Sequence, residues 1–244
     1  MKPMLAHYKA NLLELLRLPA YWIPSMVFPT MFFLFFAAPN ANHPEAASLL
    51  LGSYLVFAVL GVVMFQFGVG IASDRASAWN IFERTLPLPP LAKLAAPILT
   101  ALTFAAMAGA VLVIAAYLST PARLEPGAWI RLIPALLAGA VPLALLGLCV
   151  GYLASPKAAV PVANLLYLPL SFAGGLWVPP QFLPEFVQHI SPFTPTRQWG
   201  EAVWSAVNGT TWQAEPFIWL AGFTLLFGAI ALWGYHRDQG QRFG

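Results

Sequence analysis

Six long apolar runs, separated by short segments that hold the charged residues, constrain this chain more than any other feature. The hydrocarbon core of a bilayer is about 30 Å thick, and an α-helix needs about 20 residues to cross it. The runs lie at approximately 21–38, 49–73, 95–118, 132–153, 158–177 and 216–235. The sequence therefore predicts an all-α, polytopic membrane protein whose six transmembrane helices form a single domain over residues 1–244.

The charged residues follow the same division. Only 9% of the residues are Asp, Glu, Lys or Arg, whereas an ordinary soluble domain has about 25%. None of them lies at the centre of an apolar run, where one charge would cost about 2.5–3.5 kcal/mol. This composition excludes a water-soluble fold. The net charge of +3 is small and dispersed, so it bears on membrane orientation and not on nucleic-acid binding.

The basic residues predict which side of the membrane each loop faces. With an even number of spans, the two termini share one side. The basic residues on that side are Lys2, Lys9, Arg17, Arg75, Arg84, Lys93, Lys157, Arg237 and Arg242, and those on the other are Arg123, Arg131 and Arg197. Because cytoplasmic loops carry an excess of Lys and Arg, both termini are predicted to be cytoplasmic.

The first 20 residues precede the first apolar run and predict an amphipathic helix. Its polar stripe consists of His7, Asn11, Glu14 and Arg17, and Leu and Tyr side chains lie around the other face. Such a helix favours the interface between the headgroups and the hydrocarbon. Pro19 is expected to turn the chain into the bilayer. A cytosolic helix that packs on a partner protein is the alternative.

Residues 74–90 form the largest predicted cytoplasmic connection. Asp74 or Ser77 is a suitable N-cap for a short helix that runs to Thr85 and is ended by Pro87. The apolar positions of this helix are Trp79, Phe82 and Leu86, and the charged residues beside them are Arg75, Glu83 and Arg84. A cytoplasmic helix with exposed aromatic residues favours docking onto another protein. A solvated loop that lies on the headgroups is the alternative.

The segment GGLWVPPQFLPEFVQHISPFTPTRQW, residues 174–199, is apolar but interrupted by prolines. It follows the fifth run and is therefore predicted to be external. Two short external helices are predicted within 178–212. Apolar spacing predicts an amphipathic helix over 181–190, which is too short to cross the membrane. Thr194 and Pro195 predict the start of a second helix, with Trp199 on its apolar face, and Asn208 and Gly209 predict its end.

We expect Pro179 and Pro180 to end the fifth run, and 182–190 to dip back into the outer leaflet as a gate or lid. The residues of this candidate gate are Pro179, Pro180, Phe182, Leu183, Pro184 and Phe186.

Small residues within the runs mark places where helices approach closely. Gly147 and Gly151 form a GxxxG pair, which predicts either packing within the chain or a dimer seam. The single cysteine, Cys149, excludes an intramolecular disulfide and is expected to serve packing. The four histidines lie far apart in the sequence, so no metal site is predicted.

The chain lacks the residues of an energy-converting or catalytic protein. It has no Walker A sequence, and its apolar runs lack the ionisable groups that ion-coupled carriers use. We therefore predict no catalytic residue and no cofactor on this chain, which is not expected to be an enzyme. A transporter of this composition implies a separate ATPase subunit. The alternatives are a non-transporting membrane subunit for assembly or sensing, and an ion-coupled secondary carrier.

The order of these features, with FERTLPLPPLAKLAAP after the second run and GGLWVPPQFLPEFVQHISPFTP after the fifth, resembles the type-2 family of ATP-binding-cassette exporter permeases. The resemblance covers essentially the whole chain. It implies a homodimer, or a heterodimer with a similar permease, carried by two cytoplasmic nucleotide-binding subunits that hold ATP and Mg. It also implies an interfacial connecting helix at 1–20, a cytoplasmic coupling helix within 74–90 and an external re-entrant helical hairpin after the fifth span.

The resemblance further implies which residues contact the ATPase subunit. They are Arg75, Trp79, Phe82, Glu83, Arg84, Thr85 and, from a second cytoplasmic turn, Lys157. The chain length fits the compact members of the bacterial cytoplasmic (inner) membrane, without a fused ATPase domain. The expected cargo is a hydrophobic or amphiphilic drug, antibiotic, lipid or lipid-linked glycan, and the residues of its path are not assigned.

Overall fold

The computed structural model describes residues 2–77 and 90–243, which are helical apart from turns and short connections. The α-helices are α1 (Lys2–Leu16), α2 (Pro19–Phe32), α3 (Pro44–Met64), α4 (Ile71–Ala76), α6 (Pro90–Ser119), α7 (Pro126–Leu153), α8 (Pro156–Ala173), α9 (Glu185–Ile190), α10 (Pro195–Asn208) and α11 (Ala214–Phe243). Two π-helical stretches are η1 (Phe33–Ala37) and η3 (Phe65–Gly70), and three 3₁₀ turns are η2 (Ala38–Asn40), η4 (Pro180–Phe182) and η5 (Ser191–Phe193). The predicted all-α class is confirmed for the described residues.

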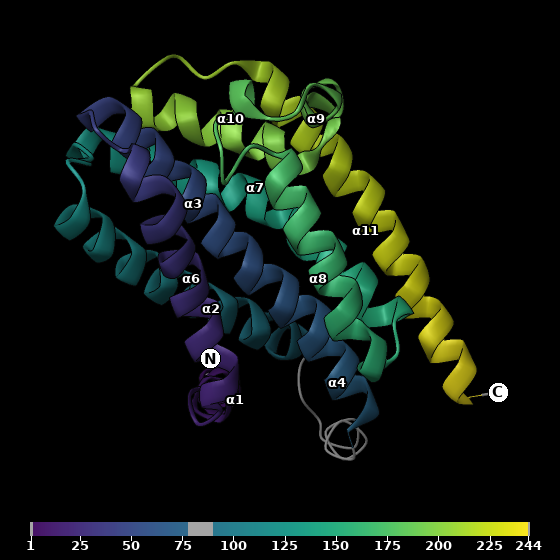
Figure 1. The fold of residues 1–244 in the computed structure, drawn as a ribbon. Coiled ribbons are helices and arrows are strands. Elements are labelled where there is room, and N and C mark those ends of the chain that lie inside the picture. The colour runs from purple at the N-terminus through teal and green to yellow at the C-terminus, as the bar shows by residue number, and fades with distance from the viewer. Residues whose placement is uncertain (1, 78–89, 244) are drawn as a thin grey trace.

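The long helices form a bundle around one central helix (Figure 1). This central helix is Pro44–Ala76, in which α3, η3 and α4 follow one another without a break. Its most apolar window is 78% buried within the protein, whereas that of α11 is 17% buried. The helices α2, α6, α7, α8 and α10 all contact α3. α11 packs mainly on α7 and lies at the edge of the bundle (Figure 1).

Four helices of the described residues are long and apolar enough to cross a membrane. They are Pro44–Ala76, Ala95–Ser119, Pro126–Leu153 and Ala214–Asp238, which correspond to the second, third, fourth and sixth predicted spans. The first predicted span corresponds to the shorter apolar stretch Ser25–Asn40. The fifth corresponds to α8, which has 18 residues. The fold is that of a multi-pass membrane protein, and the count of six spans stays a prediction.

The predicted outer end of the fifth span is wrong. α8 ends at Ala173, and Gly174 is its C-cap. Gly175 then has a φ of 74°, a left-handed conformation that glycine adopts without steric cost. The chain therefore turns at the glycine pair, and Pro179 and Pro180 follow in the loop instead of ending the helix.

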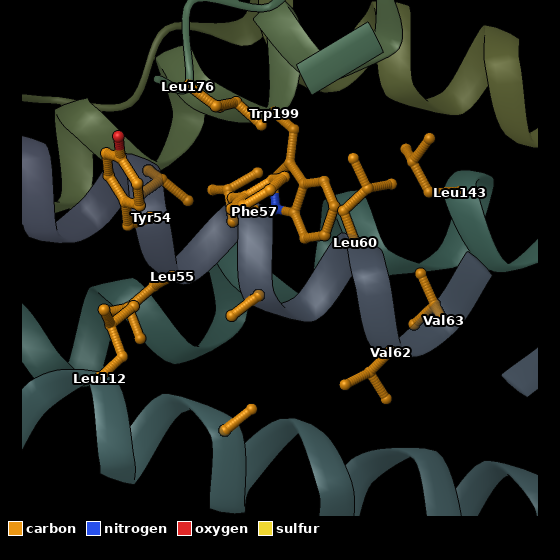
Figure 2. Close-up of a cluster of buried hydrophobic side chains, with 14 of the residues drawn as sticks. Tyr54, Leu55, Phe57, Leu60, Val62, Val63, Leu112, Leu143, Leu176 and Trp199 are labelled. Atoms are coloured by element: carbon orange, nitrogen blue, oxygen red, sulfur yellow. The ribbon is translucent and has the colours of Figure 1, made fainter. Parts of the chain in front are cut away.

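Trp199 of α10 is fully buried in the core of the bundle. Its indole points toward Phe57 and Leu60 of α3 (Figure 2). Its Nε1 donates a hydrogen bond to the carbonyl oxygen of Ala135 in α7, 3.1 Å away. Gly139 of α7 lies against the ring, because a Cβ at this position would overlap indole atoms. One side chain thereby anchors the short helix α10 in the core.

Gly147 and Gly151 bring α7 against the central helix. A Cβ on Gly147 would lie 3.1 Å from the carbonyl oxygen of Val63, and one on Gly151 would lie 2.5 Å from that of Phe67. Glycine at both positions permits this close approach of two backbones. The GxxxG pair is thus used for packing within the chain, which was one of the two predicted alternatives.

α1 lies at the lower end of the bundle in Figure 1 and is separate from α2. Trp22 holds the corner between the two helices, because its Nε1 donates to the carbonyl oxygen of Leu16 at 3.0 Å. α1 packs on α6, and the hydroxyl oxygens of Tyr8 and Thr103 are 2.8 Å apart. The segment is helical up to Leu16, and its place at the membrane interface stays a prediction.

Replacing Gly139 by alanine should destabilise the bundle, because the added methyl group would overlap the Trp199 ring. We expect a loss of about 1–3 kcal/mol, the usual cost of inserting atoms into a packed core. Gly222→Ala in α11 is the matched control, because a Cβ there meets nothing within 4 Å. The measurement is the temperature at which the purified protein loses its monodisperse peak in detergent. Gly139→Ala should lower this temperature, and equal values for the two variants would contradict the packing.

Candidate functional site

The described residues that flank the predicted coupling loop lie at the opposite end of the bundle from the predicted external hairpin (Figure 1). The loop end comprises the end of α4, the start of α6, the turn at 154–155 and the C-terminal part of α11. The hairpin end comprises residues 174–213, which include α9 and α10. Both termini lie toward the loop end in Figure 1.

Arg75, in the last turn of α4, points into the protein. One guanidinium N–H donates to the carboxylate of Asp238 in α11, and another donates to the carbonyl oxygen of Gly151 in α7 at 2.5 Å. The guanidinium carbon also lies 5.8 Å from the ring centre of Tyr152. The Arg75 side chain is 19% exposed. This predicted coupling residue therefore joins three helices at the loop end.

Most of the other predicted coupling residues lie outside the described residues. These are Trp79, Phe82, Glu83, Arg84 and Thr85. Asp74, one of the two suggested N-caps, lies within α4, so the central helix extends into the predicted loop. Ser77 follows α4 with an extended backbone, the conformation that an N-cap residue adopts. Its hydroxyl donates to the carbonyl oxygen of Asp74 at 2.8 Å.

Lys157 lies on the first turn of α8, also at the loop end. Ser155 is the N-cap of α8, because its side chain accepts the Ala158 N–H at 3.4 Å, and Pro156 occupies the first helical position. Lys157 is exposed, and α8 contacts α4. The structure thus brings Arg75 and Lys157 to the same end but presents only Lys157, of these two, at the surface.

Asp238 is a residue that the sequence interpretation missed. The chain has two aspartates, Asp74 and Asp238, and Asp238 comes just after the last apolar run, where a carboxylate is expected in solvent. In the structure it is 7% exposed. The available signal was an ionisable residue at the end of an apolar run, but its arginine partner is 163 positions away.

The candidate gate does not form the ten-residue helix predicted over 181–190. The chain forms the 3₁₀ turn η4 and then, after two further residues, the six-residue helix α9. Leu183 is extended, with a ψ of 153°, because the ring of Pro184 disfavours helical conformations in the preceding residue. Pro184 therefore divides the predicted helix.

The side chains of the candidate gate differ in exposure. Leu183 is buried, whereas Phe182 and Phe186 are 71% and 75% exposed. Gln188 closes the turn, because its Nε2 donates to the carbonyl oxygens of Leu183 at 2.7 Å and Gln181 at 3.2 Å. The turn is held by its own hydrogen bonds and presents two phenylalanines at its surface.

Two buried hydroxyl groups tie the hairpin end to α8. Ser191 Oγ donates to the carbonyl oxygen of Ala173, and Thr196 Oγ1 donates to that of Leu170, each at 2.5 Å. Both carbonyls belong to the last turn of α8, where carbonyl groups commonly lack a partner within the helix; that of Leu170 also accepts the Gly174 N–H at 2.9 Å. A displacement of the end of α8 would therefore carry the hairpin with it.

α10 begins and ends where the sequence predicts. Thr194 accepts the Arg197 N–H, Pro195 is the first helical residue, and Gly209 adopts a left-handed φ of 71° after Asn208. The buried face contains Trp199, and the opposite face carries an ion pair between Arg197 and Glu201 at 2.7 Å.

Two hollows are candidates for ligand contact. An open pocket of about 450 Å³ at the hairpin end is lined by Pro180, Gln181, Gln188, Pro192, Arg197, Glu201 and Trp204. An apolar groove of about 430 Å³ between α7 and α11 is lined by Ala138, Val141, Phe217, Leu220, Ala221, Thr224 and Leu225. The second groove has the character of a lipid-facing surface.

Residues 2–77 and 90–243 offer no group of three or more His, Cys, Asp or Glu that is placed to hold a metal ion. Cys149 is buried between α7 and α11, and its Sγ donates to the carbonyl oxygen of Phe227 at 3.3 Å. This environment agrees with the expected packing role.

Comparison with known proteins agrees with the fold and with the sequence resemblance. Residues 4–208 match the family model for the "ABC-2 type transporter". The chain is also 26% identical over 222 residues to "Putative transport permease YvfS" of Bacillus subtilis (strain 168), with 89% of this chain and 91% of the relative covered. Because the family model covers well over half of the sequence, the chain belongs to the ABC-2 type transporter family.

Proposed function

We propose that this chain is the membrane-spanning permease subunit of an ATP-driven exporter. The observation that carries the proposal is the family match over residues 4–208. ATP and Mg bind to a separate nucleotide-binding subunit, since this chain has no Walker A sequence. The cargo is a hydrophobic or amphiphilic molecule, such as a drug, antibiotic, lipid or lipid-linked glycan, which moves out of the cytoplasm or the inner leaflet.

We infer a six-span topology in a bacterial cytoplasmic membrane, with the loop end and both termini in the cytoplasm. The excess of basic residues on this side supports the orientation. Exposed aromatic residues also flank the apolar surface of α11, with Trp219 toward the hairpin end and Trp233 and Tyr235 toward the loop end. Aromatic side chains of this kind favour the level of the headgroups. In this topology, the first span is the apolar stretch that ends at Asn40, and the fifth span is α8.

The ATPase subunit would bind at the loop end. The contacting residues in this proposal are Trp79, Phe82, Glu83, Arg84, Thr85 and Lys157. Support comes from the exposed position of Lys157 beside the end of α4. Arg75 would contribute indirectly, because its hydrogen bonds hold α4, the helix that precedes residues 78–89 in the chain, against α7 and α11.

The hairpin end would act as an external gate. Its exposed phenylalanines, Phe182 and Phe186, suit contact with the outer leaflet or with cargo. The hydrogen bonds of Ser191 and Thr196 to α8 support a gate that follows this helix when it moves. Two permease chains, identical or similar, would enclose the path along their seam.

Thiol labelling tests the topology. In a Cys149→Ser background, we expect Glu185→Cys to react with an impermeant maleimide added to intact cells, because Glu185 is exposed at the proposed external end. Lys157→Cys, equally exposed but at the loop end, should react only after the membrane is permeabilised. Reaction of Lys157→Cys in intact cells, with none of Glu185→Cys, would overturn the orientation.

Co-purification with an ATP-binding-cassette ATPase from the same organism tests the proposed function. Trp79→Ala should weaken ATPase binding by about tenfold or more, since a tryptophan at the centre of an interface commonly contributes about 2 kcal/mol. Lys157→Glu should also weaken it, whereas Glu185→Lys, a matched charge reversal at the hairpin end, should not. The measurements are the amount of ATPase retained and its hydrolysis rate in proteoliposomes. Wild-type retention and hydrolysis in both Trp79→Ala and Lys157→Glu would show that the assigned contact is wrong.

A further inference from the structure

We propose that Arg75 and Asp238 form a releasable latch at the loop end, and that the π-helical stretch η3 is the hinge on which α4 moves when the latch opens. The inference assigns a conformational role to residues inside the bundle. It rests on the proposed function only for the identity of the subunit that opens the latch.

The latch joins the end of the central helix to the last helix of the chain. Arg75 donates to the carboxylate of Asp238 in α11 and to the carbonyl oxygen of Gly151 in α7. The side chains of Arg75 and Asp238 are 19% and 7% exposed. Breaking an ion pair with so little access to water is costly, because a charge that loses its partner there is poorly solvated. The closed arrangement therefore opens only when other contacts or water offset that cost.

The partners of Arg75 on α7 and α11 form a closely packed platform. The rings of Tyr152 and Tyr235 meet edge to face, with their centres 5.5 Å apart. Gly234 permits this approach, because a Cβ there would lie 3.1 Å from the Cβ of Tyr152. α4 lies at the side of this platform, in contact with α7 and α8. Arg75 thus fastens a short helix to two helices that are already packed on each other.

The hinge lies directly before α4. η3 spans Phe65–Gly70, the six residues that separate α3 from α4. A π-helical stretch interrupts the regular hydrogen-bond ladder of an α-helix and is a recognised place for bending. Gly68 and Gly70 lie within it, and a Cβ on Gly70 would meet only the carbonyl oxygen of Phe65, at 3.8 Å. The backbone at Gly70 is therefore less confined than that at Gly68, which packs on Gly147 and Val150 of α7.

The two features together give a lever of six residues, Ile71–Ala76, between a hinge and a latch. Force applied to residues 78–89 reaches Arg75 before it reaches the core. When the pair is closed, α4 stays in line with α3. When it opens, α4 can turn about Gly70 while Gly147 of α7 keeps its contact with Val63 of α3, and Ile71 at the start of α4 then moves against Gly151.

Distances between spin labels on α4 and α11 test the latch in the isolated permease. In a Cys149→Ser background, labels are placed at Ala76→Cys and Leu232→Cys, two exposed positions that are not members of the ion pair. We expect one narrow distance distribution with the pair intact and a longer, broader one with Asp238→Asn. Glu215→Gln, a carboxylate change at the other end of α11, should have no effect.

The control for folding is the monodisperse peak of each variant in detergent. An unchanged distribution in well-folded Asp238→Asn protein would overturn the latch.

The complex with the ATPase tests the release. With a non-hydrolysable ATP analogue bound, a permease in which Arg75 and Asp238 are unchanged should show longer label distances, like those of Asp238→Asn. A complex that binds the ATPase and the nucleotide without any shift would show that the pair is a static clamp and would overturn the release step. Failure of the ATPase to bind would contradict the proposed function instead, and the measurement on the isolated permease would still decide whether the latch exists.

Discussion

The packing of α7 on its neighbours holds the rest of the structure together, because α7 contacts α10 at the hairpin end and the central helix toward the loop end. Gly139, Gly147 and Gly151 lie at helical spacing along one face of α7, and each leaves room for a neighbour. The Trp199 ring packs against Gly139, whereas the backbone of the central helix packs against the other two glycines. The carbonyl oxygen of Gly151 also accepts a hydrogen bond from Arg75. In hydrocarbon no hydrophobic force draws helices together, so close packing at small residues has to supply much of the association.

This arrangement connects the proposed ATPase contact to the proposed gate. At the loop end, Arg75 holds α4 against α7 and α11. At the hairpin end, Trp199 holds α10 against the same helix α7, and Ser191 and Thr196 hold the hairpin to α8. Movement of α4 relative to α7 would therefore alter the contacts at the loop end. Movement of α8 relative to α7 would alter those at the hairpin end. The short helices at the hairpin end are thus connected to α7 and α8 by packing and hydrogen bonds.

The sequence predicted those features that depend on local chemistry. The apolar runs gave the helical class, and Thr194, Pro195 and Gly209 marked the ends of α10. It misplaced the end of α8, because a glycine pair is compatible with a membrane helix, and only the fold places Thr196 against Gly174 and Pro180 against Gly175. A Cβ on Gly174 would lie 2.6 Å from the Thr196 hydroxyl oxygen. It also treated 181–190 as one helix, although the constraint that Pro184 places on Leu183 was visible in the sequence.

The remaining features depend on pairs that are distant in the sequence. The amphipathic pattern of α10 predicted an apolar face, but only the fold shows that Trp199 reaches Gly139 in the core. Arg75 had the properties of a docking residue because a cytoplasmic arginine beside an aromatic helix is expected at a surface. Its pairing with Asp238, 163 positions away, follows from the position of α11 beside α7.

In the proposed function, a separate ATPase acts on the loop end of this permease. A cryo-electron microscopy structure of the permease bound to its ATPase partner in a lipid nanodisc would test this directly. We expect the ATPase to contact residues 78–90 and Lys157, on the membrane side opposite α9 and α10. An ATPase bound at the hairpin end, or a complex in which residues 78–90 and Lys157 make no contact with it, would show that the proposed coupling is wrong.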